Sequence, residues 1–128
     1  MKFLLDTHLV LWIPVDDPKI SREARAILSD PSNECIFSVA SIWEIAIKKR
    51  LGRPDFPHDP REIRALFLQN GYQELPIESR HAVLVDSIAL IHKDPFDRIL
   101  IAQSMAEGIT LLTADPEIAS YPGPIRKI

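Results

Sequence analysis

Short apolar runs alternate with longer amphipathic segments along the chain. The runs at residues 2–5 and 35–38 are aliphatic and bounded by polar residues, which is typical of buried strands. Weaker strand candidates lie at residues 72–75, 110–113 and 125–127. Because strands that alternate with helices form sheets covered on both faces, we predict an α/β fold with a mainly parallel, roughly five-stranded central sheet.

The apolar spacing predicts helices at residues 7–13, 21–29, 41–51, 61–70, 79–91 and 95–107. Apolar side chains surround most of the last segment, so we expect this helix to be buried. Gly108 follows it directly, in the position where glycine commonly ends a helix. Aspartate-proline pairs begin at Asp17, Asp30, Asp59, Asp94 and Asp115. Each pair predicts a turn or a helix start, because aspartate caps free backbone amides and proline fits the first helical turn.

The composition is that of one globular domain covering residues 1–128, with 46% hydrophobic and 26% charged residues. A net charge of -3 argues against a protein that coats nucleic acid through bulk positive charge. The four glycines are too scattered for a glycine-rich nucleotide loop. The single Cys35 allows no internal disulfide, and no apolar run reaches the roughly 18 residues of a membrane helix. We therefore expect a cytoplasmic protein without a membrane contact.

Four carboxylates fall at the ends of predicted strands or the starts of predicted helices. Asp6 ends the first strand, and Glu44 lies in the first turn of the helix that follows the second strand. Asp97 lies in the first turn of the helix that begins at residue 95, and Asp115 follows the apolar run at 109–112. Ligands of open parallel sheets bind at the carboxyl ends of the strands, where neighbouring loops converge. These acids are therefore candidates for a shared site.

Helix capping is the structural alternative for the same acids. Asp6, Asp94 and Asp115 are suitable N-cap residues, and residues 41–44 and 94–97 have the spacing of capping boxes. Each acid taken alone is better explained as a cap, because such motifs stabilise helices without any function. Their joint placement favours a site, because gathered carboxylates repel one another unless a cation compensates them.

Oxygen ligands without a cysteine or histidine pair indicate Mg²⁺ or Mn²⁺ rather than zinc. A metal-bound water becomes a better nucleophile, and the metal stabilises the charge of a phosphoryl group under attack. Hydrolysis of a phosphodiester bond is the reaction that such a site predicts.

Four sequence blocks carry a resemblance to a known family: Met1–Trp12 with LLDTH, Ser38–Lys48 with SVASIWEIAIK, His92–Gln103 with HKDPFDRILIAQ, and residues 111–115 with LLTAD. Together they resemble a PIN domain, and more narrowly the VapC-like toxins of bacterial type II toxin–antitoxin modules. The resemblance spans nearly the whole chain in the expected order. It implies a three-layer α/β/α sandwich and a Mg²⁺-dependent endoribonuclease that a cognate antitoxin inhibits.

On that pattern, Asp6, Glu44 and Asp97 are the central catalytic and metal-binding acids, and Asp115 is the fourth. The resemblance also implies a homodimer or a toxin–antitoxin hetero-oligomer, with operator DNA contacted only through the antitoxin. RNA is the implied substrate. The sequence identifies neither the RNA target nor the antitoxin.

Five further residues are secondary candidates. Thr7 and Ser38 are placed to hydrogen-bond a metal-bound water or a carboxylate, although hydroxyl groups at helix starts are more often caps. Asp94 is ranked below the site acids because it precedes a proline as a cap would. Helical spacing puts Lys48 on the same side as the site, so it is a candidate RNA contact. Arg98 is a second such candidate.

The aromatic and histidine residues carry weaker signals. Trp12 and Trp43 fall at helical spacings among apolar neighbours, which favours the core or a dimer interface over base stacking. Metal-ligand spacing is not found among His8, His58, His81 and His92.

Two other classes of function stay open at this point. A receiver-like phosphorylation switch has a similar length, a parallel sheet and Mg²⁺-binding acids. It normally has paired acids after the first strand, whereas Asp6 is followed by Thr7. A catalytically inactive binding module would use the acids only as caps or as a docking surface for the antitoxin.

Overall fold

A five-stranded parallel sheet forms the centre of the computed structural model, which describes residues 1–91 and 93–128. His92, which begins one of the four resembling sequence blocks and was expected to be no metal ligand, lies outside the described residues. The strands are β1 (Lys2–Leu5), β2 (Glu34–Ser38), β3 (Gln73–Leu75), β4 (Thr110–Thr113) and β5 (Ile125–Lys127), in the spatial order β3-β2-β1-β4-β5. All neighbouring pairs are parallel, which confirms the predicted α/β fold and the five strands.

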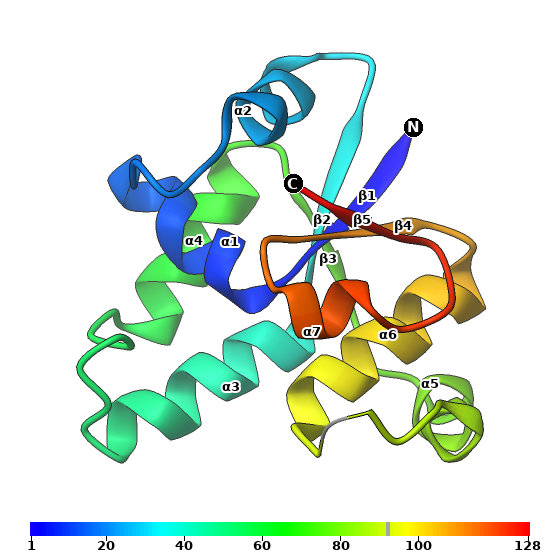
Figure 1. Ribbon diagram of the computed structural model, residues 1–128. Coiled ribbons are helices and arrows are strands. Elements are labelled where there is room, and N and C mark those ends of the chain that lie inside the picture. The colour runs from blue at the N-terminus through cyan, green and yellow to red at the C-terminus, as the bar shows by residue number, and fades with distance from the viewer. Residues whose placement is uncertain (92) are drawn as a thin grey trace.

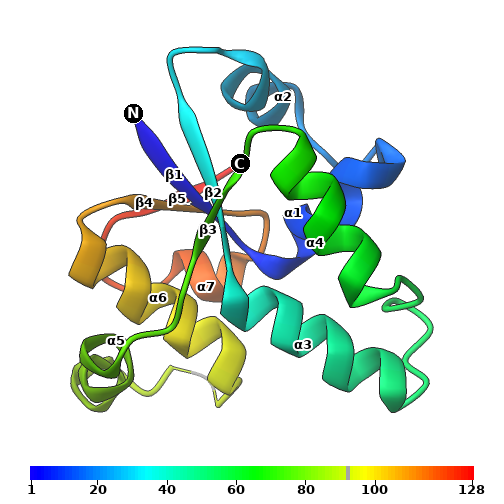
Figure 2. The ribbon, with the colours of Figure 1, turned by 180° about the vertical axis from the view of Figure 1, so that it is seen from behind.

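The helices are α1 (Thr7–Trp12), α2 (Arg22–Ser29), α3 (Val39–Arg50), α4 (Pro60–Gln69), α5 (Ser79–Leu84), α6 (Pro95–Glu107) and α7 (Pro116–Ala119). Two 3₁₀ turns, η1 (Ile13–Val15) and η2 (Val85–Ser87), follow α1 and α5. Helices α1, α2 and α4 lie on one side of the sheet, and α5, α6 and α7 lie on the other (Figure 1). The view from behind shows the same three layers (Figure 2).

Side chains that point alternately to the two faces of each central strand form the two apolar cores. In β1, Phe3 and Leu5 pack with α1, α2 and α4, whereas Leu4 packs with α6 and α7. Phe37 of β2 faces the first core and its neighbour Ile36 faces the second. Because successive side chains of a strand point to opposite faces, a strand covered on both faces must be apolar at every position. This explains the continuous apolar runs of the sequence.

The register brings the carboxyl ends of the central strands to one edge of the sheet. Leu5 at the end of β1 pairs with Leu112 of β4, and Leu4 pairs with Ile36 of β2. The chain leaves β1 between β2 on one side and β4 on the other, which is the switch point where open parallel sheets bind ligands. Side chains that follow β1, β2 and β4 therefore meet at this edge.

The aspartate-proline pairs behave as predicted. Asp59, Asp94 and Asp115 are the N-caps of α4, α6 and α7, and each accepts a hydrogen bond from a backbone amide of the first turn. Asp17 and Asp30 accept from the amides two residues ahead and close turns instead. Helix α6 has the predicted limits and ends at a glycine in the left-handed region. In the part of the chain that the structure describes, no helix is long and apolar enough to cross a membrane.

The helix predicted at residues 79–91 is wrong at its C-terminal end. Helix α5 stops at Leu84, one 3₁₀ turn follows, and Ile88 is already extended. The guanidinium of Arg98 accounts for this shape, because it donates to the carbonyl oxygens of residues 85, 88 and 89 at 2.9–3.1 Å. Backbone groups that a helix would pair internally are paired here by a side chain from α6.

We expect Arg98→Met to lower the free energy of unfolding by about 2 kcal/mol, because charged hydrogen bonds to three carbonyl groups are lost. Urea denaturation measures this change. Arg61→Met, at an exposed position of α4, is the matched control and should change stability by less than about 0.5 kcal/mol. Equal stability of the two variants would contradict the structural role of Arg98.

Candidate metal centre

Asp6 is the first residue after β1, and it is both buried and tightly held. Its amide donates to the carbonyl oxygen of Leu112, which extends the pairing of β1 with β4. Its carboxylate accepts from the amide of Leu9 at 3.1 Å, as the N-cap of α1, and from the hydroxyl of Thr113 at 2.5 Å. Burial raises the pKa of Asp6, and these two hydrogen bonds oppose the rise. The orientation of this carboxylate is therefore fixed before any ligand binds.

Thr113 connects two of the predicted acids. Its buried hydroxyl donates to Asp6 and accepts from the amide of Asp115 at 3.0 Å. Asp115 in turn accepts from the amide of Glu117 and begins α7. Sequence reasoning did not single out Thr113. The available signal was a threonine at the end of a strand, two positions before an acid, where its hydroxyl closes a local turn.

Glu44 lies in the second turn of α3, so its predicted place in the first turn and the capping box predicted over residues 41–44 are both wrong. Ser38 caps this helix, and the helix begins at Val39. The Glu44 side chain is 3% exposed, and its negative charge acts on Asp97 of α6. One oxygen, Oε2, accepts from the ammonium of Lys48 at 2.5 Å. The other oxygen, Oε1, is buried and has no hydrogen-bond partner among the described residues.

Asp97 lies half-buried in the first turn of α6. The N-cap Asp94 accepts from the amides of Phe96 and Asp97, which confirms Asp94 as a cap. Burial raises the pKa of Asp97 to about 8, and nearby negative charges add to this rise. These charges belong, in order of decreasing effect, to Asp94, Glu44, Asp6 and Asp115. The predicted acids thus lie close enough together to hold a proton that a lone carboxyl would release.

A cavity of about 230 Å³ opens beside this cluster, and Asp6 and Asp115 both line it. All of the clustered donors are carboxylate oxygens, which suit a hard divalent cation such as Mg²⁺ or Mn²⁺. Two further features fit such an ion: the unpartnered Oε1 of Glu44 and the charge repulsion felt at Asp97. A bound cation would satisfy the first and relieve the second.

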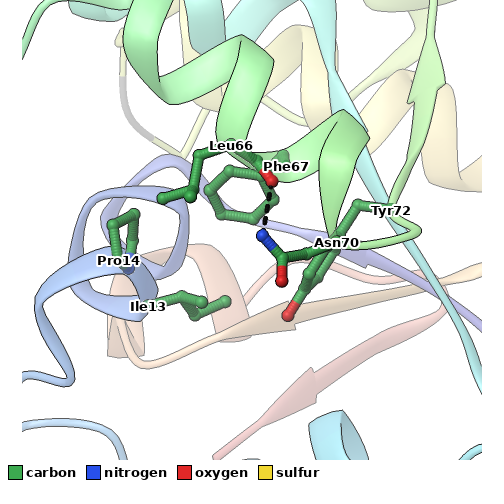
Figure 3. Close-up of a pocket in the computed structure, with 6 residues that line it drawn as sticks. All are labelled: Ile13, Pro14, Leu66, Phe67, Asn70 and Tyr72. Carbon is green, nitrogen blue, oxygen red and sulfur yellow. Dashed lines mark hydrogen bonds between the residues drawn. The ribbon is translucent and has the colours of Figure 1, made fainter.

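The apolar pocket shown in Figure 3 lies elsewhere, between η1 and α4. Its volume is about 260 Å³, and it is lined by Ile13, Pro14, Leu66, Phe67, Asn70 and Tyr72. The Asn70 amide donates to the carbonyl oxygen of Leu66 and is thereby held against its own helix (Figure 3). This lining includes no carboxylate, so the pocket offers none of the ligands that a metal centre needs.

The hydroxyl groups predicted to support the centre have structural partners. Thr7 and Ser41 share a buried hydrogen bond of 3.0 Å, which joins α1 to α3. Ser38 accepts from the amide of Ala40 and donates to the buried amide oxygen of Gln103 at 2.5 Å. Gln103 was not predicted from the sequence. These contacts fix α3 and α6 relative to β2, and a direct role of Thr7 or Ser38 at a metal stays a prediction.

The two predicted RNA-contacting residues have different environments. The Lys48 ammonium lies 4.9 Å from the ring centre of Phe56 and 5.9 Å from that of Phe96, beside the acids. Arg98 is engaged by backbone carbonyl groups, as described above. Trp43 contacts Phe96 edge to face and is 55% exposed, so the core half of its expectation is wrong, and a place in a dimer interface stays a prediction.

A second group of potential ligands lies between α5 and α6, where atoms of Glu78, His81 and Glu107 come within 4.8 Å of one another. The guanidinium of Arg80 already bonds both carboxylates. His81 accepts from the amide of Glu78 through Nδ1, so Nε2 carries the ring proton and donates to Glu107. The protein's own donors therefore already bond one oxygen of each carboxylate, and the ring of His81 has no free lone pair, so this group does not fit a metal ion.

The sequence matches the family model described as PIN domain over residues 3–124, and the chain belongs to the PIN domain family. This confirms the resemblance found in the four sequence blocks. The five-stranded parallel sheet between layers of helices is the α/β/α sandwich that the resemblance implied. A comparison with curated proteins gives no match.

Several solved structures share the fold at low sequence identity. VapBC2 from Rickettsia felis, bound to a DNA fragment of its promoter, matches with a TM-score of 0.73 and 13% identity, covering 99% of this chain and 98% of that chain. DNA-bound VapBC from Salmonella typhimurium matches with a TM-score of 0.66, 18% identity and the same coverage. Mycobacterium tuberculosis VapC20, a toxin that cleaves the sarcin-ricin loop, matches at 0.62 and 14%, covering 95% and 97%.

The raised pKa of Asp97 predicts that the ion-free protein loses stability as the pH rises from about 5 to 8. Between an unfolded-state pKa of about 4 and the folded-state value, only the folded chain holds this proton, so raising the pH favours unfolding. Asp97→Asn should flatten the dependence and be more stable than the wild type at pH 8. Thermal unfolding in EDTA measures both effects.

Asp59→Asn, at the N-cap of α4 and outside the acidic cluster, is the control and should keep the loss of stability that Asp97 causes between pH 5 and 8. The pKa of Asp6 is also raised, so Asp6 also makes stability fall as the pH rises. Part of the pH dependence of stability should therefore remain in Asp97→Asn. An unchanged slope in Asp97→Asn would refute the assignment.

Proposed function

We propose that this protein is a VapC-like toxin of a type II toxin–antitoxin module that acts as a metal-dependent endoribonuclease. Membership of the PIN domain family and the fold shared with VapC toxins, one of which cleaves the sarcin-ricin loop, support this proposal. The reaction is hydrolysis of RNA phosphodiester bonds at the cluster formed by Asp6, Glu44, Asp97 and Asp115. Mg²⁺ is the proposed cofactor, and Mn²⁺ is an alternative.

The buried, unpartnered Oε1 of Glu44 is the observation that carries the proposal. Buried polar atoms are almost always hydrogen-bonded, and an exception inside a cluster of like charges indicates a cation-binding site. Caps alone do not explain this oxygen, because Glu44 caps no helix. This is the reason to prefer a metal-dependent enzyme over a catalytically inactive binding module.

The chain's own residues would hold the ion and prepare the site. Asp6 presents an oriented carboxylate, because Thr113 and the amide of Leu9 hold it from two sides. Asp97 carries a proton near neutral pH in the ion-free protein and must release it when a cation binds. When bound, the ion supplies an activated water and stabilises negative charge on the phosphate. The metal, rather than a surface rich in Lys and Arg, would then balance the charge of RNA.

The proposed partners follow from the same family relationship. The structural relatives include VapBC toxin–antitoxin complexes, and two of them are bound to DNA. We infer a cognate antitoxin for this chain, assembly as a homodimer or a toxin–antitoxin hetero-oligomer, and contact with operator DNA only through the antitoxin.

A receiver-like switch is not retained as an alternative. The flavodoxin-like sheet of that class has the strand order 2-1-3-4-5. The order here is β3-β2-β1-β4-β5, with β1 in the centre and joined to β4. The first strand is also followed by a single acid instead of an acidic pair.

We expect the purified protein to cleave RNA with Mg²⁺ or Mn²⁺, and excess EDTA to stop the reaction. Asp6→Asn and Asp97→Asn should each lower the cleavage rate at least about 100-fold while the circular dichroism spectrum stays native, because each removes a metal-binding charge. Asp86→Asn, at an exposed position of η2, is the matched control and should leave the rate unchanged.

Full activity in both site variants would overturn the assignment of the centre. A wild-type protein that neither cleaves RNA nor takes up a divalent ion in isothermal titration would instead be an inactive binding module. Sequencing the cleavage ends of cellular RNA after expression would identify the target.

A further inference from the structure

Lys48 contacts the proposed metal centre from inside the protein. It lies one helical turn after Glu44 on α3, and its ammonium is 2.5 Å from Oε2 of that residue. The Lys48 side chain is only 17% exposed, and the rings of Phe56 and Phe96 lie beside the ammonium. Three separate parts of the chain therefore hold the cation in place: α3, the loop that follows it, and the first turn of α6.

This pair differs from an ordinary surface ion pair between neighbouring turns. Exposed pairs at this spacing contribute little, because water competes with both partners. Here the carboxylate is 3% exposed, so removal of its cation would leave a buried charge with no partner. The ammonium is also close to aromatic rings, which favour a cation over their faces.

The contact with Lys48 satisfies only one of the two carboxylate oxygens of Glu44. Lys48 takes Oε2, while the buried Oε1 has no hydrogen-bond partner among the described residues. A divalent ion bound by Glu44 must therefore share the carboxylate with an ammonium or displace it. Sharing weakens ion binding because two cations repel each other across one carboxylate, and displacement weakens it because the contact between Lys48 and Glu44 must first be broken.

We propose that Lys48 is a built-in counter-cation that competes with the divalent ion for the Glu44 carboxylate and thereby sets the metal affinity of the centre. This inference rests on the proposed function of the acidic cluster as a metal centre. Lys48 is a positioning residue in this role, because it acts through Glu44. It keeps the carboxylate oriented while no ion is bound, at the expense of affinity for the ion.

Lys49 provides a matched comparison on the same helix. It carries the same charge one position further on, but its side chain is exposed. If the overall charge of α3 controlled ion binding, neutralising either lysine would have similar effects. If the contact with Glu44 controls it, only Lys48 matters.

Isothermal titration of the purified full-length chain with Mn²⁺ tests the proposal. Lys48→Met keeps most of the stem between the rings and removes the charge, and it should bind Mn²⁺ about tenfold more tightly than the wild type. Lys48→Arg, which keeps a cation, and Lys49→Met should each stay within about twofold of the wild type. Unchanged or weaker binding by Lys48→Met would overturn the proposal.

A Glu44→Gln background separates direct competition from a general charge effect. Adding Lys48→Met to Glu44→Gln should not change the Mn²⁺ affinity, because no carboxylate remains to compete for. A gain in affinity there would show that Lys48 acts through space, which contradicts the proposal. The double variant leaves no unpaired buried charge, so its folding does not depend on Lys48.

Thermal unfolding with and without Mn²⁺ gives an independent readout. Lys48→Met should be less stable than the wild type in EDTA and should gain more stability from Mn²⁺. A variant that folds only with Mn²⁺ would be the extreme form of the expected result, and one that stays unfolded with Mn²⁺ would contradict it. A wild type that binds no Mn²⁺ would refute the metal centre itself, whereas binding that is insensitive to Lys48 refutes only this inference.

Discussion

The carboxylates at the carboxyl edge of the sheet repel one another, and the other groups of the site are arranged in ways that reduce this repulsion. The topology places β1 between β2 and β4, so acids that follow separate strands meet in a partly buried space. The protein offsets their repulsion by three different means. Thr113 and a backbone amide stabilise Asp6, the ammonium of Lys48 stabilises Glu44, and Asp97 retains its proton. Oε1 of Glu44 has no hydrogen-bond partner among the residues that the structure describes, and this distinguishes the cluster from a set of caps.

Capping and site formation are not alternatives in this fold, because the same hydrogen bonds serve both. Asp6 begins α1 through the amide of Leu9, and that bond also fixes the direction of its carboxylate. Asp115 begins α7 while Thr113 ties it to Asp6. In a parallel sheet every strand must be followed by a turn into a helix, so acids placed there for local stability already lie at the ligand-binding edge. A metal centre can therefore arise without additional structural elements.

Local sequence patterns were sufficient to predict most of the strands and helices. Continuous apolar runs located β1 and β2, and an aspartate-proline pair with a following glycine located the limits of α6. The end of α5 could not be predicted, because it depends on Arg98, more than ten residues further along the chain, taking over backbone carbonyl groups. Thr113 and Gln103 were missed for the same reason, since their partners Asp6 and Ser38 are distant in sequence. Motifs predicted the candidate acids and helical spacing placed Lys48 on their side, but neither predicted that Thr113 and Lys48 bond these acids.

The two groups of potential ligands in this chain show why residue type alone does not identify a metal centre. Glu78, His81 and Glu107 contain a histidine and two carboxylates, yet the guanidinium of Arg80 bonds one oxygen of each carboxylate and the ring proton of His81 goes to Glu107. At the site acids, the ammonium of Lys48 bonds one oxygen of Glu44, and the other oxygen of Glu44 has no hydrogen-bond partner in the part of the chain that the structure describes. Both groups bring negative charges together, but only the second leaves hydrogen-bonding capacity unfilled in a buried place. The balance between acceptors and the protein's own donors is therefore a better criterion for a cation site than the count of acids.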